Sequence, residues 1–112
     1  MARLPRIRGT QVGLRNPASV DAIKADMKAE LFRFTDLDGQ IGGILDGAGV
    51  YHVMEGHHRM AAALELFRQT GDDRFVRELL RWGRWSIGLR PSMSRPMPAR
   101  SWWGRLRNRI GY

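Results

Sequence analysis

A glycine in the middle of this chain separates a strand-like run from a helix-like run, within the segment YHVMEGHHRMAAAL at residues 51–64. The residues before Gly56 include the β-branched and aromatic side chains that favour strands. Those after it repeat at the spacings of one helix face: Met60, Ala63, Leu64 and Phe67. Because glycine tolerates a tight turn, the segment predicts a strand that ends at Glu55 and a helix that begins near His57.

Apolar spacing along the rest of the chain predicts the other elements. An Asp- and Gly-rich turn, Asp46–Gly49, lies between two short apolar runs, which is typical of a β-hairpin. We therefore expect an α+β fold, a short mixed sheet with a hairpin packed against three to four helices. The expected elements are a strand or extended arm at 3–14, a helix at 18–32, strands at 40–45 and 50–54, a helix from His57 to Gly71, a helix from Asp72 or Asp73 to Trp82, and a weakly patterned helix at 102–110.

The net charge of +8 comes from the C-terminal part of the chain. Residues 1–80 contain 11 basic and 11 acidic residues, whereas residues 81–112 contain 8 Arg, no acid and all 4 Trp. We therefore predict a domain at 1–83 and a basic extension at 84–112. Such an extension is either an ordinary charged segment that packs on the domain or a contact for nucleic acid or an acidic protein. Its candidate nucleic-acid contacts are Arg81, Arg84, Trp102, Trp103, Arg105 and Arg107.

Composition excludes several classes of protein. The chain has no cysteine, which rules out disulfides, thiolate metal sites and cysteine nucleophiles. No apolar run approaches the roughly 20 residues that cross a bilayer, so we expect no membrane partner. Its 112 residues are enough for a single core.

The expected helix start after Gly56 has the properties of a phosphate-binding site. Its first amides have no partner within the helix, and they lie at the positive end of the helix dipole. Arg59 adds a bidentate donor. His57 and His58 can donate to a phosphate when charged, or act as general acid and base. Consecutive helical residues point about 100° apart, so at least one of the two histidines is expected to face the ligand.

For other polar side chains near this turn, the sequence allows either a role in the site or a structural role. Glu55 is expected to serve as a partner base, to help hold a metal, or to be only a solvated strand end. Gln11 either reaches the same pocket or is a surface amide, and His52, inside a strand, is expected to be structural. No protein metal site is expected, because two adjacent histidines rarely chelate one ion and no other spacing completes a site. Mg²⁺ could arrive bound to substrate phosphates.

The segment from about Gln40 to Leu66 resembles the phosphate-binding box of the ParB/sulfiredoxin superfamily. In that family a hairpin leads into a turn similar to Gly-Glu-Arg-Arg, Gly-Cys-His-Arg or Asp-Gly-His-His-Arg, and then into an Ala-rich helix. Here the turn reads Glu55-Gly56-His57-His58-Arg59. Strictly the resemblance covers about a quarter of the chain. It extends over about 70 residues when the upstream helix and the RIRGTQVGLRNP segment are included.

The resemblance implies an enzyme that acts on phosphate esters. His57 occupies the position of the sulfiredoxin cysteine, which excludes that activity, and the chain lacks room for the added domains of a partitioning protein. Gly9–Gly13 resembles the start of the ParB-like nuclease domains at the C-terminal ends of bacterial polymorphic toxins. The resemblance thus implies a nuclease, with DNA favoured over RNA. Its catalytic residues would be Glu55, His57 and His58, and its phosphate-binding residues Gly56, His57, His58 and Arg59.

Two alternatives to a nuclease remain open. One is a nucleotide-hydrolysing or phosphoryl-transfer enzyme that uses the same box. The other is a non-catalytic module that binds nucleic acid with a steep salt dependence. A toxin domain would act in the cytoplasm of a target cell, delivered as part of a larger secreted protein, and would be matched by an acidic immunity protein.

Overall fold

Three helices and five strands follow one another in the part of the chain that the computed structural model describes, residues 3–11, 13–36 and 39–97. In chain order they are β1 (Ile7–Gly9), α1 (Pro17–Lys28), β2 (Gly42–Leu45), β3 (Tyr51–Glu55), α2 (His57–Thr70), α3 (Arg74–Trp82), β4 (Arg84–Ile87) and β5 (Arg95–Pro96). The expected α+β fold is confirmed. The helix expected at 102–110 lies outside the described residues.

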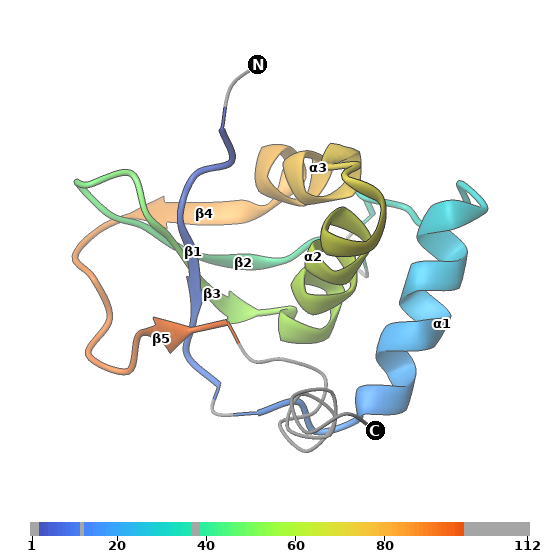
Figure 1. Ribbon diagram of the computed structural model, residues 1–112. Helices are drawn as coiled ribbons and strands as arrows, with labels where there is room; N and C mark the ends of the chain where they lie inside the picture. Colours follow the sequence, from blue (N-terminus) through green and yellow to red (C-terminus); the bar gives the residue numbers. More distant parts are fainter. Residues whose placement is uncertain (1–2, 12, 37–38, 98–112) are drawn as a thin grey trace.

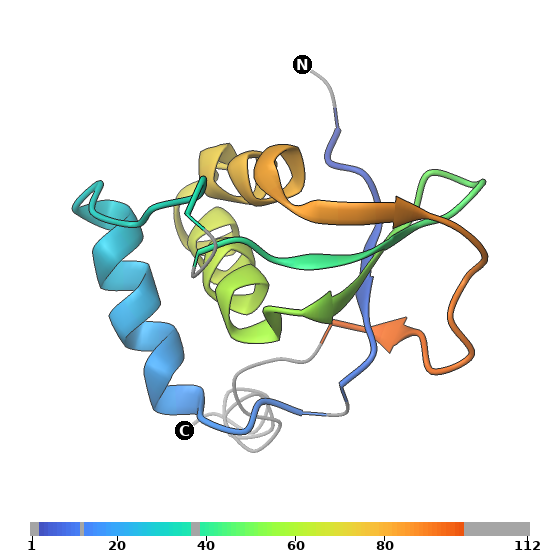
Figure 2. The same ribbon diagram turned by 180° about the vertical axis from the view of Figure 1, so that it is seen from behind.

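The strands form one mixed sheet in the order β4-β2-β3-β1-β5. The predicted hairpin is its centre: β2 runs antiparallel to β3, with a register shift between Gly42 and Gly43. Strand β1 pairs parallel with β3, and β4 pairs parallel with β2. Because the parallel pairs need crossover connections, the helices lie in the links between paired strands, and they gather on one side of the sheet (Figures 1 and 2).

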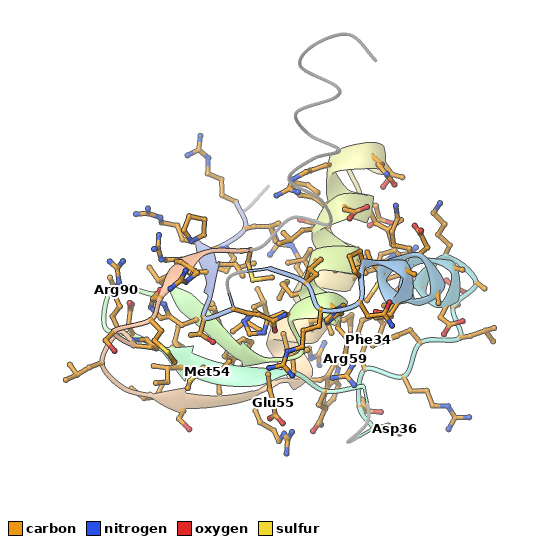
Figure 3. The ribbon with its side chains drawn as sticks, turned by 90° about the horizontal axis from the view of Figure 1, so that it is seen from below. Phe34, Asp36, Met54, Glu55, Arg59 and Arg90 are labelled. Carbon is orange, nitrogen blue, oxygen red and sulfur yellow. The ribbon has the colours of Figure 1, made fainter. Side chains whose placement is uncertain are left out.

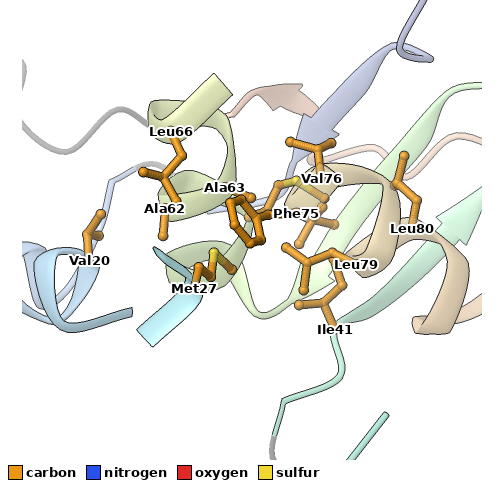
Figure 4. Close-up of a cluster of buried hydrophobic side chains, with 12 residues drawn as sticks. Val20, Met27, Ile41, Ala62, Ala63, Leu66, Phe75, Val76, Leu79 and Leu80 are labelled. Carbon is orange, nitrogen blue, oxygen red and sulfur yellow. The ribbon is translucent and has the colours of Figure 1, made fainter. Parts of the chain in front are cut away.

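The core lies between the helices and the sheet. Helix α2 is central and packs against both α1 and α3 (Figure 1). Its small side chains, Ala61–Ala63, are at most 3% exposed, which allows the neighbouring helix to approach closely. Figure 4 shows the apolar cluster that joins the three helices to the start of β2: Val20, Met27, Ile41, Ala62, Ala63, Leu66, Phe75, Val76, Leu79 and Leu80.

Helix α1 is shorter than its apolar pattern predicts. We expected a helix over 18–32, but α1 ends at Lys28. Glu30 has a φ of 60°, in the left-handed region, so the chain turns away at this point and Leu31 is 70% exposed. Lys24 is buried rather than on the outer face, because its ammonium group pairs with the Glu65 carboxylate of α2 at 3.2 Å.

The sheet continues past the predicted domain boundary at residue 83. Strands β4 and β5 both follow that residue and pair with β2 and β1. The Trp85 indole packs edge-on against Tyr51, with ring centroids 4.8 Å apart, and donates a hydrogen bond to the Leu80 carbonyl at 2.9 Å. The division into 1–83 and 84–112 therefore does not coincide with the edge of the sheet, and residues 84–97 are part of the folded unit.

A buried network of polar side chains connects the β4–β5 segment to the hairpin through hydrogen bonds. His52 is fully buried on β3, and its Nε2 lies 2.7 Å from the Asp46 carboxylate. Its Nδ1 lies 2.7 Å from the Ser94 hydroxyl, which also accepts a 2.9 Å hydrogen bond from Arg8 Nε. The hydrogen bond from His52 lowers the pKa of Asp46, together with the Val50 and Ala48 amides. This agrees with the structural role expected for His52.

Candidate phosphate-binding site

Gly56 makes the turn between β3 and α2 that the sequence predicts. Its backbone has φ 91° and ψ 31°, a left-handed conformation that side chains disfavour. A Cβ at this position would lie 2.3 Å from Ile41 Cγ2, so the space beside the turn is already filled. Glycine is therefore required here both for conformation and for packing.

The first turn of α2 presents amides without internal partners. The first hydrogen bond of the helix runs from the Met60 amide to the Gly56 carbonyl at 3.1 Å, and no side chain caps the helix. Among the described residues, nothing accepts a hydrogen bond from the amides of His57, His58 and Arg59. These three donors and the positive end of the helix dipole together favour an anion.

A cleft of about 530 Å³ opens at this helix end. Residues from the loop before α1 and from α1 itself form one wall, and the end of β3 and the start of α2 form the other. In Figure 3, Met54, Glu55 and Arg59 lie near one another where β3 runs into α2. The lining residues are Gln11, Arg15, Ser19, Ile23, Met54, Glu55, Gly56, His57, His58 and Arg59.

The His57 ring borders the cleft but is held by the main chain. It is 4% exposed, its Nε2 accepts the Thr10 amide at 3.1 Å, and the ring also hydrogen-bonds the Val53 carbonyl. Burial lowers its pKa, and the neighbouring His58 acts in the same direction, although the Val53 bond opposes them. A neutral ring with both nitrogens occupied does not suit the catalytic and phosphate-contact roles expected for His57; it holds the β1 end against α2.

His58 is the more accessible of the two histidines. Its Nε2 accepts a 3.0 Å hydrogen bond from the Asn16 amide. An imidazole that accepts at Nε2 carries its proton at Nδ1, and no described residue binds that second nitrogen. His58 lines the cleft, and its Nδ1 is left without a partner among the described residues.

Arg59 and Glu55 stand on the same side of the cleft mouth. The Arg59 guanidinium makes one 3.3 Å bond to the Gln40 carbonyl, which leaves most of its donors for an anion. The Glu55 side chain is 73% exposed and pairs with Arg84 at 3.3 Å. Both residues line the cleft, as expected from the sequence.

The loop before α1 contributes more than we expected. Gln11 does line the cleft, although its amide also bonds the Gly13 carbonyl. Arg15 adds a second cleft guanidinium, and Asn16 orients His58. Sequence reasoning missed both, because residues 15 and 58 are far apart in the chain; the basic RNP segment just before a helix was the available signal.

The arginines and tryptophans expected to bind nucleic acid are only partly described. Arg84 reaches the cleft region through Glu55, whereas Arg81 lies 5.1 Å from the ring centre of its neighbour Trp82 on α3. The other four expected contacts, Trp102, Trp103, Arg105 and Arg107, lie outside the described residues.

The described residues contain neither a cluster of metal-binding side chains nor a membrane-spanning helix. Within them, no group of three or more His, Asp or Glu side chains could hold a metal ion, and the cleft itself has one carboxylate, Glu55. None of the helices α1, α2 and α3 in this part of the chain is long and apolar enough to span a bilayer.

Comparison of the chain with protein-family models, with curated proteins and with solved structures finds no match. The residues and geometry of the cleft are therefore the basis on which a function can be proposed for it.

Proposed function

We propose that this protein is a phosphodiester-cleaving nuclease whose active site is the cleft at the start of α2. One observation carries the proposal: the cleft combines three free helix amides with two guanidinium groups, an imidazole and a carboxylate. Such a set can hold a phosphate diester and also supply the proton transfer that hydrolysis needs. The resemblance of the Gly56–Arg59 turn to the ParB/sulfiredoxin box supports the same class of reaction.

In the proposed complex the scissile phosphate binds the amides of residues 57–59. Arg59 and Arg15 lie on opposite walls of the cleft and neutralise the charge that develops during in-line attack. His58 donates from Nδ1 to a phosphate oxygen. His57 is a positioning residue, because it joins the end of β1 to the helix that carries these amides.

Glu55 is the base that we propose for the attacking water. Its carboxylate accepts a proton as water attacks phosphorus. The bond from phosphorus to the leaving oxygen breaks on the opposite side, where the leaving oxygen takes a proton from solvent water, and Glu55 later returns its proton to solvent. Because the proposed nucleophile is water, no ribose 2′-hydroxyl is required, so the mechanism applies to DNA, the substrate that the family resemblance favours. A Mg²⁺ ion bound to the substrate phosphates would be held by Glu55, the carboxylate that lines the cleft.

A plasmid-cleavage assay with single substitutions tests this assignment. His58→Gln, Glu55→Gln and Arg59→Gln should each lower the cleavage rate about 10²- to 10⁴-fold, the usual range for loss of a proton-transfer or charge-stabilising group. Arg90→Gln, on the exposed connection after β4, removes an equal charge away from the cleft and should leave the rate unchanged. If the three variants cut as fast as the parent, the cleft is not the active site.

A free nucleotide is the second candidate substrate. The cleft volume of about 530 Å³ falls in the range of small-molecule sites and accommodates a nucleotide. Incubation with labelled ATP and, separately, with plasmid and total RNA distinguishes the two. Loss of ATP with intact nucleic acid would replace the nuclease proposal. Salt-dependent binding without any turnover would instead identify a non-catalytic module.

We propose the biological setting from the family resemblance alone. As a polymorphic-toxin domain, the protein would act on nucleic acid in the cytoplasm of a target cell after delivery within a larger secreted protein. An acidic immunity protein would cover the cleft. Expression inside bacteria tests this setting: cell death with degraded chromosomal DNA is expected, and normal growth with intact DNA contradicts it.

A further inference from the structure

A second hollow, of about 500 Å³, lies along the start of β1. Its walls come from the start of β1, the second half of α2 and the end of β5. Three guanidinium groups line it, from Arg6, Arg8 and Arg68, and no acidic residue does. We call it the arginine groove. Its remaining surface is apolar: Leu4, Pro5, Ile7, Leu64, Pro96 and Met97.

Two of the three arginines are unpaired. Arg8 is fixed by Ser94, whose hydroxyl and carbonyl accept from its Nε and Nη2 at 2.9 and 3.2 Å. Arg6 and Arg68 are exposed, and among the described residues neither makes an ion pair or a side-chain hydrogen bond. A fold that places three like charges around one hollow without an acidic partner favours an anionic ligand.

The groove and the cleft lie at the two ends of one extended segment. Arg6 continues the ladder of β1, because its carbonyl accepts the Tyr51 amide at 3.0 Å, and Gln11 lines the cleft five residues later. Strand β1 ends at Gly9 and Thr10 begins a bend, so at about 3.3 Å per extended residue the backbone positions of Arg6 and Gln11 are at most roughly 16 Å apart. A nucleic-acid strand spans a separation of this size within a few nucleotides.

We propose that the arginine groove is a second phosphate subsite, which holds a nucleic-acid strand a few nucleotides from the phosphate in the cleft. This deepens the proposed function and rests on it for the choice of ligand. Arg6 and Arg68 bind backbone phosphates, and the apolar floor, including Leu64 and Met97, accommodates the adjoining bases or sugars. The groove thus makes the protein prefer a polymer to a short fragment.

The charge of the chain argues against its own C-terminal segment as the occupant. Residues 98–112 contain 4 Arg and no acidic residue, so they would meet the groove with charge of the same sign. An acidic polypeptide has the right sign of charge. The alignment of groove and cleft along β1 favours nucleic acid, since one strand then serves both sites.

Binding of the full chain to nuclease-resistant phosphorothioate oligonucleotides tests the proposal. Fluorescence anisotropy would compare a single-stranded 20-mer with a trinucleotide, for the parent, for Arg6→Gln/Arg68→Gln and for Lys28→Gln/Arg90→Gln. The second double variant removes the same charge at exposed positions outside the groove. For the 20-mer, the groove variant should lower the slope of log K against log salt by about 1.4, the value for two lost contacts to a single strand. For the trinucleotide, groove and control variants should bind alike.

The outcomes separate this inference from the proposed function. Equal slopes for the groove and control variants with the 20-mer would overturn the subsite, whether or not the protein cuts DNA. Displacement of the parent's 20-mer by polyglutamate at a lower concentration than by unlabelled 20-mer would also overturn it, in favour of an acidic protein. A groove-dependent slope in a protein that cuts nothing would support the subsite and refute the nuclease.

Discussion

Two constraints require glycine at position 56: the left-handed backbone and the lack of space for a Cβ atom. Alanine substitutions at Gly56 and Gly71 measure the two effects separately. Gly56→Ala should lower the free energy of unfolding by about 2 to 5 kcal/mol, from a left-handed backbone and from overlap with Ile41. Gly71→Ala shares the backbone conformation, with φ 77°, but its Cβ would meet open space. It should cost only about 1 to 2 kcal/mol. Urea denaturation of both variants measures the difference, and equal losses would contradict the packing argument.

The buried ring of His57 makes stability depend on pH. Burial lowers its pKa below the ordinary histidine value of about 6.5, so in acid the unfolded chain binds a proton that the folded chain resists. Its contribution is complete above about pH 6.5 and declines as the pH falls through and below that value, by at most about 1.4 kcal/mol per pH unit. The lowered pKa of Asp46 acts in the same direction but in a more acidic window, below the ordinary aspartate value of about 3.9.

Thermal denaturation between pH 5 and 8 measures this effect. The parent should lose stability toward pH 5 more steeply than His57→Gln, which has no imidazole to protonate at that position. His58→Gln is the matched control, because it keeps the buried ring and should retain the parent's dependence. If His57→Gln follows the parent's pH curve, the His57 ring is not the group responsible.

At the scale of elements, the link between β4 and β5 depends on one hydroxyl. Ser94→Ala would leave His52 Nδ1 and Arg8 Nε without their partner, and His52 is fully buried. An unsatisfied buried polar group costs about 1 to 3 kcal/mol. We expect that loss in urea denaturation, with faster amide exchange over residues 88–95. Ser92→Ala, at an exposed position of the same connection, should change stability by less than about 0.5 kcal/mol.

Helices and strands whose apolar residues recur at regular spacing could be predicted from the sequence. A strand that forms only by pairing with a strand far away in the sequence could not. The spacing of Met60, Ala63 and Leu64 identified α2, and the Asp46–Gly49 turn identified the hairpin. Strand β4 (RWSI) has no such pattern, since it becomes a strand by pairing with β2, about 40 residues earlier. The predicted α1 is too long because the spacing of apolar residues gives no sign of the left-handed backbone at Glu30, where the chain leaves the helix.

Across the whole molecule, the same limit applies to the candidate site. The Gly56 turn and the free amides after it follow from local sequence, so the cleft residues Glu55 and Arg59 could be predicted. The two histidines could not be told apart, because their roles are set by the amides of Thr10 and Asn16, more than 40 residues away. One bond holds His57 inside the fold, and the other orients His58 toward the cleft.

Two shortened chains test where the folded unit ends. A chain of residues 1–83 lacks β4, β5, the Trp85–Tyr51 contact and Ser94, which leaves one side of His52 without its partner and β2 as a bare edge. It should lose cooperative thermal unfolding and tend to aggregate. A chain of residues 1–97 retains all five strands and should unfold cooperatively, as measured by circular dichroism. If the chain of residues 1–83 unfolds cooperatively with the parent's midpoint, the folded domain ends at residue 83 as the sequence predicts.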